Sequence, residues 1–160
     1  MMMQYSDQTK VMSTRRFGVE TMEVTNFDLE RLDPDRRGGG WLNDEVINFY
    51  LALVAERENA GGKMRVLVQS TYFWTNLTKP QYNYQKVSRW SKRRGAAGLK
   101  ILDLDCMIIP INQNNSHWTL AVINFKKKRF EYYDSLGVNP ETRRLYIKAG
   151  PPVSARSALT

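Results

Sequence analysis

The apolar run at residues 106–111 is the feature that most restricts the fold. It reads Cys-Met-Ile-Ile-Pro-Ile, and a continuous apolar run of this length is typical of a strand buried on both faces of a sheet. Two segments with alternating apolar residues follow, Trp118–Phe125 and Arg129–Asp134, and the three lysines between them predict a turn. The polar stretch 112–116 predicts a loop. This half of the chain therefore predicts three strands of one sheet.

Helical patterns precede these strands. Thr25 followed by Asp28 predicts the capped start of a short helix. Asn43 or Asp44 predicts the start of a longer one, because apolar residues then recur at three- and four-residue spacing. Residues 84–94 predict a basic helix, and 66–68 a short strand or an apolar link. Helices first and a sheet later indicate an α+β domain.

The two ends of the chain show no such patterns. Residues 1–20 are polar and aperiodic, so we expect a mobile leader there. Residues 141–148 could begin a helix, but Gly150 and the two prolines after it stop the pattern. The last residues, 149–160, are small, polar and aperiodic, with no obvious way to join a core.

Composition limits the class of protein. The 160 residues carry a net charge of +8 and a single cysteine, Cys106. One cysteine excludes an intramolecular disulfide and suits a reducing compartment, and no apolar run is long enough for a membrane span. We expect a protein of the nucleus or cytoplasm, with no cofactor and no metal site. A nucleic-acid role rests on dispersed basic residues alone and has no recognised motif to support it.

One histidine and one aspartate are the candidates for catalysis. His117 is the only histidine in the chain and starts the first strand of the predicted hairpin, whereas Asp134 ends the second. A hairpin brings these two positions to the same end of a sheet. A histidine with a carboxylate is two thirds of a nucleophilic triad. A lone histidine beside a tryptophan is more often structural, so the neighbouring motifs decide between the two interpretations.

Four segments together resemble the SUMO proteases (sentrin-specific proteases), which are cysteine proteases specific for ubiquitin-like proteins. They are WLNDEVINFY at 41–50, STYFWTNL at 70–77, PINQNNSHWTLAVINFKKK at 110–128 and YYDSLG at 132–137. Their order and spacing also match this family. The resemblance implies a papain-like α+β fold, and hydrolysis at the C-terminal Gly-Gly of SUMO, from a target lysine or from a precursor. We expect residues 21–148 to form this catalytic domain in part, and 149–160 to be a tail outside the family.

The resemblance also assigns roles to individual residues. His117 matches the catalytic histidine and Asp134 the acid that orients it. Trp41 and Trp118 match the paired indoles that roof the tunnel for the substrate's glycines. The remaining two candidates for substrate binding are Asp44, which matches an acid that pairs with a basic residue of SUMO, and Phe73, which lies in a segment lining the same surface. Trp41 and Asp44 also have simpler interpretations, as a helix-entry residue and a helix cap.

The family's nucleophile has no counterpart in these 160 residues. The resemblance places an oxyanion glutamine and the cysteine in a Gln-x-x-x-x-x-Cys-Gly stretch well downstream of the aspartate, and no such stretch is present. Cys106 precedes His117 and lies in an apolar run, where a thiol is usually inert. Gln113 also precedes His117. We therefore expect an incomplete papain-like fold, which keeps the N-terminal helices and the central antiparallel sheet but lacks the nucleophile helix.

Three functions follow from this incomplete motif set. The first is a SUMO-specific cysteine protease by family, with these 160 residues inactive alone. The alternatives are a catalytically dead fragment that binds SUMO, and a protease for another ubiquitin-like modifier. An uncovered apolar sheet face would forgo roughly 1.5–3 kcal/mol for each large side chain. Since net stabilities are only about 5–15 kcal/mol, we expect the isolated chain to be aggregation-prone or molten.

Overall fold

The computed structural model describes residues 7–33, 35, 40–91 and 100–137. Two sheets and one long helix form its framework: the sheet orders are β1-β2 and β3-β4-β5-β6. The strands are β1 (Val11–Phe17), β2 (Glu20–Thr25), β3 (Val66–Val68), β4 (Cys106–Gln113), β5 (His117–Asn124) and β6 (Arg129–Tyr133). The helices are α1 (Asn26–Leu29), α2 (Asp44–Ala60) and α3 (Phe73–Thr78), with 3-10 turns η1 (Glu30–Leu32), η2 (Tyr84–Lys86) and η3 (Ile101–Asp103).

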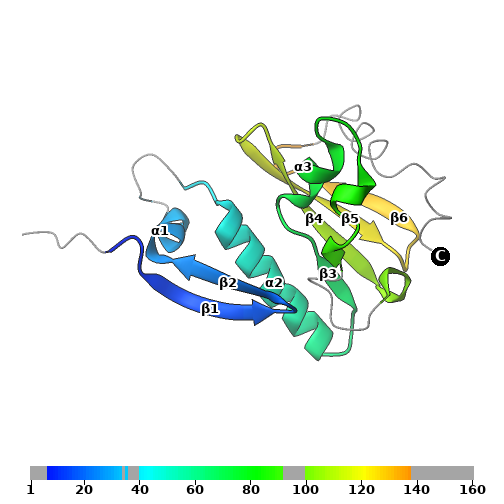
Figure 1. Cartoon of the computed structure of the whole chain (residues 1–160), viewed down its shortest axis with the longest axis horizontal. Helices are drawn as coiled ribbons and strands as arrows, with labels where there is room; N and C mark the ends of the chain where they lie inside the picture. Colours follow the sequence, from blue (N-terminus) through cyan, green and yellow to red (C-terminus); the bar gives the residue numbers. More distant parts are fainter. Residues whose placement is uncertain (1–6, 34, 36–39, 92–99, 138–160) are drawn as a thin grey trace, which may run out of the picture.

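Helix α2 lies between the β1-β2 hairpin and the four-stranded sheet (Figure 1). Its N-cap is Asn43, whose side-chain oxygen accepts a hydrogen bond from the backbone N–H of Val46 at 3.0 Å. At the start of α1, Thr25 and Asp28 form a capping box. Both predicted helix starts are therefore confirmed. In each, a side-chain cap satisfies a backbone donor that the first turn of the helix leaves free.

The β1-β2 hairpin corrects the prediction of a mobile leader for the described part of residues 1–20, whereas residues 1–6 lie outside the described residues. Residues 11–17 form β1, which pairs antiparallel with β2. Six of the seven β1 residues are exposed, so the strand shows no apolar alternation. The hairpin instead buries Met22 and Val24 of β2, and Gly18 turns the chain at a positive φ of 61°. Burial on one strand thus orders a partner whose own sequence gives no signal.

The four-stranded sheet has the predicted strands at its centre and edge. β4 pairs antiparallel with β5, and β5 with β6, whereas β3 pairs parallel with β4. The sheet is therefore mixed and not wholly antiparallel. β4 is buried over most of its length, as its apolar run predicts. It extends to Gln113, so the predicted loop begins two residues late, at Asn114.

The predicted helix over residues 84–94 is largely wrong within the described part of the chain. Only the 3-10 turn Tyr84–Lys86 and a helical start at Trp90 lie there. Val87 ends the 3-10 turn and is buried in the core. Residues 92–94, and the predictions for 141–148 and 149–160, lie outside the described residues.

The two faces of the sheet differ in how they are covered. On one face, α3 and the loops around it bury a cluster of nine residues: Leu67, Phe73, Leu77, Val87, Leu104, Met107, Ile109, Ile111 and Tyr132. On the other face, α2 covers a smaller cluster, Val66, Val68 and Cys106, with Leu51, Ala55, Ile108 and Val122 partly buried against it. We call these the α3 face and the α2 face.

Candidate active site

His117 and Asp134 meet at one end of the sheet. His117 begins β5 and Asp134 directly follows β6, and the two strands are antiparallel neighbours. The lysine-rich turn lies at the opposite end, since Asn124 pairs with Arg129. The His117 Nε2 and Asp134 Oδ1 atoms are 2.6 Å apart. This confirms the prediction that the hairpin brings the two side chains together.

The loop before His117 contains two residues in the left-handed region. Asn114 and Asn115 have φ values of 53° and 55°, a conformation that asparagine tolerates better than most residues. The Asn112 side chain accepts a hydrogen bond from the Asn115 N–H at 2.7 Å. This side-chain amide thus supports the turn that leads from β4 directly into β5 at His117.

The carboxylate of Asp134 is held in its charged form. Its hydrogen bond with His117, together with the Leu136 N–H at 3.0 Å, keeps its pKa below the ordinary value. The side chains of His117 and Asp134 are only 20% and 10% exposed. An ionised acceptor at Nε2 places the ring proton there. Nδ1 is then the nitrogen that can exchange a proton with a nucleophile or a leaving group.

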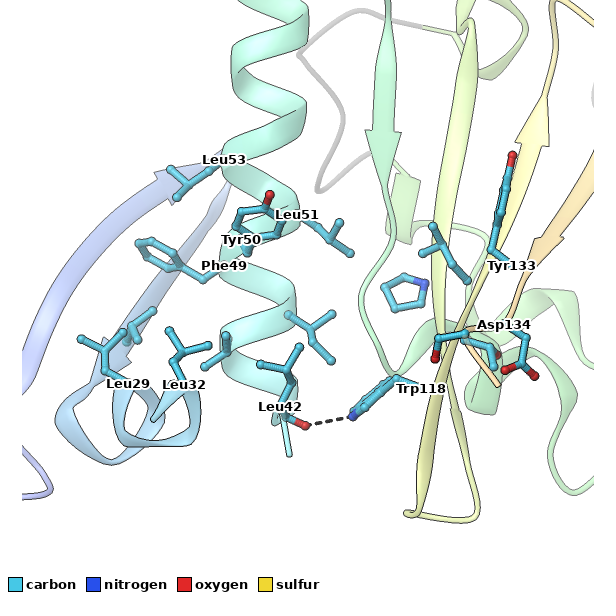
Figure 2. Close-up of a pocket in the computed structure, with 17 residues that line it drawn as sticks. Leu29, Leu32, Leu42, Phe49, Tyr50, Leu51, Leu53, Trp118, Tyr133 and Asp134 are labelled. Carbon is cyan, nitrogen blue, oxygen red and sulfur yellow. Dashed lines mark hydrogen bonds between the residues drawn. The ribbon is translucent and has the colours of Figure 1, made fainter. Parts of the chain in front are cut away.

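Trp118 connects the histidine strand to α2. Its indole Nε1–H donates a hydrogen bond to the Leu42 carbonyl at 2.9 Å. Figure 2 shows this bond crossing from β5 to the entrance of α2, with Asp134 on the sheet side. Trp41 precedes Leu42 in the chain and is 56% exposed. Trp118 is therefore one end of this link, and Trp41, the chain neighbour of the other end, is open to solvent.

Asp44 lies in the first turn of α2 and has an unexpected neighbour. The Tyr72 hydroxyl donates a hydrogen bond to Asp44 Oδ2 at 3.3 Å. Burial, and then the Asp44 carboxylate, raise the pKa of Tyr72, so its hydroxyl keeps its proton. Sequence reasoning missed Tyr72, because nothing in the spacing of residues 44 and 72 indicates a contact between them.

Phe73 lies in the core and not on a surface. It is 9% exposed and belongs to the α3-face cluster. Its ring meets the Trp90 ring edge-on, with centroids 6.1 Å apart. The predicted substrate contact at Phe73 is therefore replaced by a packing role. The exposed member of this segment is its neighbour Tyr72.

A polar network missed in the sequence lies on the same sheet face as His117. Gln113, the register partner of His117, donates a hydrogen bond through Nε2 to the Tyr132 hydroxyl at 2.6 Å. The same nitrogen lies 3.3 Å from the Thr119 hydroxyl. These contacts join the ends of β4, β5 and β6. Gln113 thus has a structural partner across the sheet.

An apolar cleft of about 990 Å³ adjoins the histidine–aspartate pair. Its sheet wall is formed by Pro110, Trp118, Leu120 and Tyr133, with Asp134 and Ser135 at one end. The rest of its lining includes Leu42, just before α2, Tyr50 and Leu51 of α2, and Leu29 and Leu32 of α1 and η1 (Figure 2). Within the described residues, the α2 face therefore carries an apolar cleft beside the cluster of Val66, Val68 and Cys106.

Cys106 lies far from the pair. It begins the 8-residue strand β4, and Gln113 at the other end of that strand faces His117. At about 3.3 Å per residue, this separation is roughly 23 Å. The thiol is also buried in the α2-face cluster, and burial raises its pKa. Its position and its protonation are both unsuited to attack on a substrate held at His117.

Neither a metal site nor a membrane helix lies in the described part of the chain. In residues 7–33, 35, 40–91 and 100–137, no three histidine, cysteine or acidic side chains gather in a way that could hold a metal ion. Within the same ranges, no helix has the length and apolar character to cross a membrane.

Residues 40–159 match the sequence profile of the Ulp1 protease family, C-terminal catalytic domain. The chain belongs to this family of cysteine proteases. The match includes nearly all of residues 149–160, so it does not support a family boundary at residue 148.

Relatives and a solved structure agree with this assignment. The chain is 42% identical over 118 residues to ubiquitin-like-specific protease 1A of Arabidopsis thaliana, an alignment covering 71% of this chain and 22% of that protein. It is 36% identical over 116 residues to human sentrin-specific protease 2, covering 72% of this chain and 18% of the relative. It therefore spans only about a fifth of the length of these proteases.

The structural comparison supports the α+β fold. The C-terminal Ulp1 protease domain, solved in complex with Smt3, the yeast ortholog of SUMO, superposes with a TM-score of 0.68 at 32% identity. The superposition covers 89% of this chain and 57% of the yeast domain. The chain therefore shares the Ulp1 protease fold over most of its own length.

Proposed function

We propose that this chain provides the histidine–aspartate half of the active site of a SUMO-specific cysteine protease. Such an enzyme cleaves the isopeptide bond to a target lysine or trims the SUMO precursor. The observation that carries the proposal is the 2.6 Å contact between His117 Nε2 and Asp134 Oδ1. Family membership and the likeness to a domain solved with a SUMO ortholog support the choice of substrate.

The pair would serve a thiolate in two steps. With Nε2 bonded to Asp134, the imidazole takes the thiol proton at Nδ1, which makes the cysteine a good nucleophile. The same nitrogen then returns a proton to the leaving lysine amine. Asp134 stabilises the imidazolium and keeps the ring oriented. Its lowered pKa keeps it ionised at neutral pH.

Substrate recognition is assigned to three residues. Trp118, fixed by Leu42, and the exposed Trp41 would enclose the glycines at the SUMO C-terminus. Glycines lack side chains, so an indole-walled slot admits them and excludes bulkier residues. Asp44 would pair with a basic residue of SUMO, and the Tyr72 hydroxyl would hold its carboxylate.

The nucleophile is proposed to come from outside these 160 residues. Cys106 lies at the wrong end of β4 and is buried. The apolar cleft beside Asp134 is the place where a cysteine-bearing helix would pack. Without that helix, and without an oxyanion glutamine, we expect the 160 residues to be inactive alone.

A fluorogenic SUMO C-terminal substrate tests this proposal. Loss of a triad nucleophile costs on the order of 10⁶-fold in the measured protease example, so we expect no turnover by the chain itself. Adding a separate C-terminal segment of a family member, with its cysteine, should produce turnover that His117→Ala abolishes. Turnover by the chain alone that disappears in Cys106→Ser would overturn the proposal.

A second candidate function is binding of SUMO without hydrolysis. It is favoured by the exposed indole of Trp41 and the Asp44–Tyr72 contact, which need no nucleophile. Titration of labelled SUMO against the chain should then show saturable binding that Asp44→Arg removes. Titrating other ubiquitin-like modifiers in parallel would distinguish a protein of this class with a different partner.

A further inference from the structure

Asp28 is a buried carboxylate that connects two helix starts. It is 5% exposed, and both of its oxygens accept hydrogen bonds. Oδ2 accepts from the Thr25 N–H at 2.8 Å and from its hydroxyl at 2.6 Å. Oδ1 accepts from Asn43 Nδ2 at 2.6 Å. Thr25 caps α1 and Asn43 caps α2, so one carboxylate fixes the two caps relative to each other.

Asn43 uses both ends of its amide. Its Oδ1 accepts the Val46 N–H of α2, whereas its Nδ2 donates to Asp28. A residue needed only as a cap would use the oxygen alone. The Asn43 nitrogen therefore has a second role, which is to hold the N-terminus of α2 against α1.

Leu42 extends this connection to the active site. It directly precedes Asn43, and its carbonyl accepts the Trp118 indole N–H at 2.9 Å. Trp118 in turn follows His117 on β5. A continuous series of hydrogen bonds and chain neighbours thus runs from Asp28 through Asn43 and Leu42 to the residue beside the histidine.

We propose that Asp28 and Asn43 are positioning residues, which hold the Leu42 carbonyl where the Trp118 indole binds and so fix that indole in the cleft lining that also includes Asp134. The link crosses the end of the apolar cleft, so it also sets the distance between α2 and β5 there. What the indole does for the substrate rests on the proposed function, whereas the placement of the indole does not.

The substitution Asn43→Asp separates linking from capping. Aspartate caps a helix as well as asparagine does, so the bond to Val46 remains. The new carboxylate, however, faces the buried Asp28 carboxylate at the position where Nδ2 now donates, and two like charges at this distance repel. A hydrogen bond to a charged group typically changes the equilibrium constant between the closed and the open state by more than about a factor of ten. We expect the Trp118 indole N–H to exchange with solvent at least about tenfold faster.

The double substitution Asp28→Asn with Asn43→Asp restores the link with its polarity reversed. The amide introduced at position 28 would donate to the carboxylate introduced at position 43, while its oxygen would still accept from Thr25. The carboxylate at position 43 would still cap α2, and the net charge is unchanged.

The matched control is Asn83→Asp. Asn83 caps η2 by accepting the Gln85 N–H, so this variant makes the same change of amide to carboxylate at a cap in another part of the chain. The control should leave the exchange of the Trp118 indole unaffected.

The experiment uses the full chain with ¹⁵N labelling, and measures hydrogen exchange of the Trp118 indole together with exchange of the Val46 amide. We expect fast indole exchange with a protected Val46 in the single variant, and recovery of the indole in the double variant. Unchanged indole exchange in Asn43→Asp would overturn the proposal, as would a double variant no better than the single one. If the Asn43→Asp variant unfolds, the double variant tests the proposal: slow exchange of the Trp118 indole there supports the link, and fast exchange overturns it. Failure of an added C-terminal segment of a family member to produce turnover would count against the proposed function without changing this readout.

Discussion

The two faces of the four-stranded sheet are built from similar residues but covered differently. The α3 face closes over a nine-residue cluster that includes Phe73, Ile111 and Tyr132. In the described part of the chain, α2 covers a smaller cluster on the other face, Val66, Val68 and Cys106, and a cleft of about 990 Å³ lies at the histidine end. The difference shows that the strands themselves do not decide where the core is complete. The elements laid over each face decide it.

Replacing one aliphatic residue on each face gives the largest expected contrast. Ile111 is 1% exposed in the α3-face cluster, so Ile111→Ala should cost roughly 2–5 kcal/mol of unfolding free energy. Leu120 lines the cleft and is only partly buried. Leu120→Ala should cost less than about 1.5 kcal/mol, the lower end for a fully buried side chain.

Urea unfolding followed by tryptophan fluorescence measures both values. Equal costs at Ile111 and Leu120 would show that the α2 face is packed as completely as the α3 face. The distinction between the two faces would then be lost.

The next largest expected effect is on the binding of ANS, a dye that becomes fluorescent on apolar surface. The chain should bind ANS at neutral pH before it melts, because the cleft offers apolar walls to the dye. Leu120→Gln should weaken this binding, since it places an amide on the sheet wall. Ala60→Gln at the exposed end of α2, outside the cleft lining, is the control. A sharp cooperative melt without prior dye binding would mean that the chain forms a finished domain.

The smallest expected effect is that of lowering the pH. We expect acid to reduce the stability of β6 before that of β4. Hydrogen bonds from Tyr133 and Arg129 lower the pKa of Glu131 to about 2, and the pKa of Asp134 is lowered through His117. A carboxyl whose pKa is lower in the folded state stabilises that state above its unfolded pKa. This contribution is lost as pH falls toward the folded value.

For Glu131 the window runs from about 4.5 down to about 2. Amide hydrogen exchange at stepwise lower pH should therefore show β6 losing protection while β4, between Met107 and Ile111, keeps it. Glu131→Gln should remove much of this acid sensitivity at β6. Simultaneous loss of protection in both strands would argue for one cooperative unit instead of two unequal faces.

Local patterns predicted that His117 and Asp134 would meet. His117 and Asp134 lie on one hairpin, so strand alternation and a turn of lysines were enough to bring them together. The Asn43 cap was equally local. These features depend on residues close in sequence, whose geometry the chain itself dictates.

Contacts between distant segments could not be predicted in the same way. Leu42 with Trp118 and Asp44 with Tyr72 join parts of the chain with no shared period. Phe73 was assigned to a surface from the resemblance of its segment, and the six residues of α3 are too few for a periodic pattern to show which side is buried. Strand β1 is almost wholly exposed, so its sequence shows no apolar alternation. Its strand conformation depends on pairing with β2.

The bond between Trp118 and Leu42 has a consequence for the order of folding. It joins residues 76 positions apart, whereas His117 and Asp134 are separated by 17. Short loops close first, and hairpins form within about 1–10 μs, while distant contacts wait for the entropy of a larger loop to be repaid. The histidine and its carboxylate are thus assembled early, within a single hairpin. The indole wall beside them is completed late, when α2 arrives.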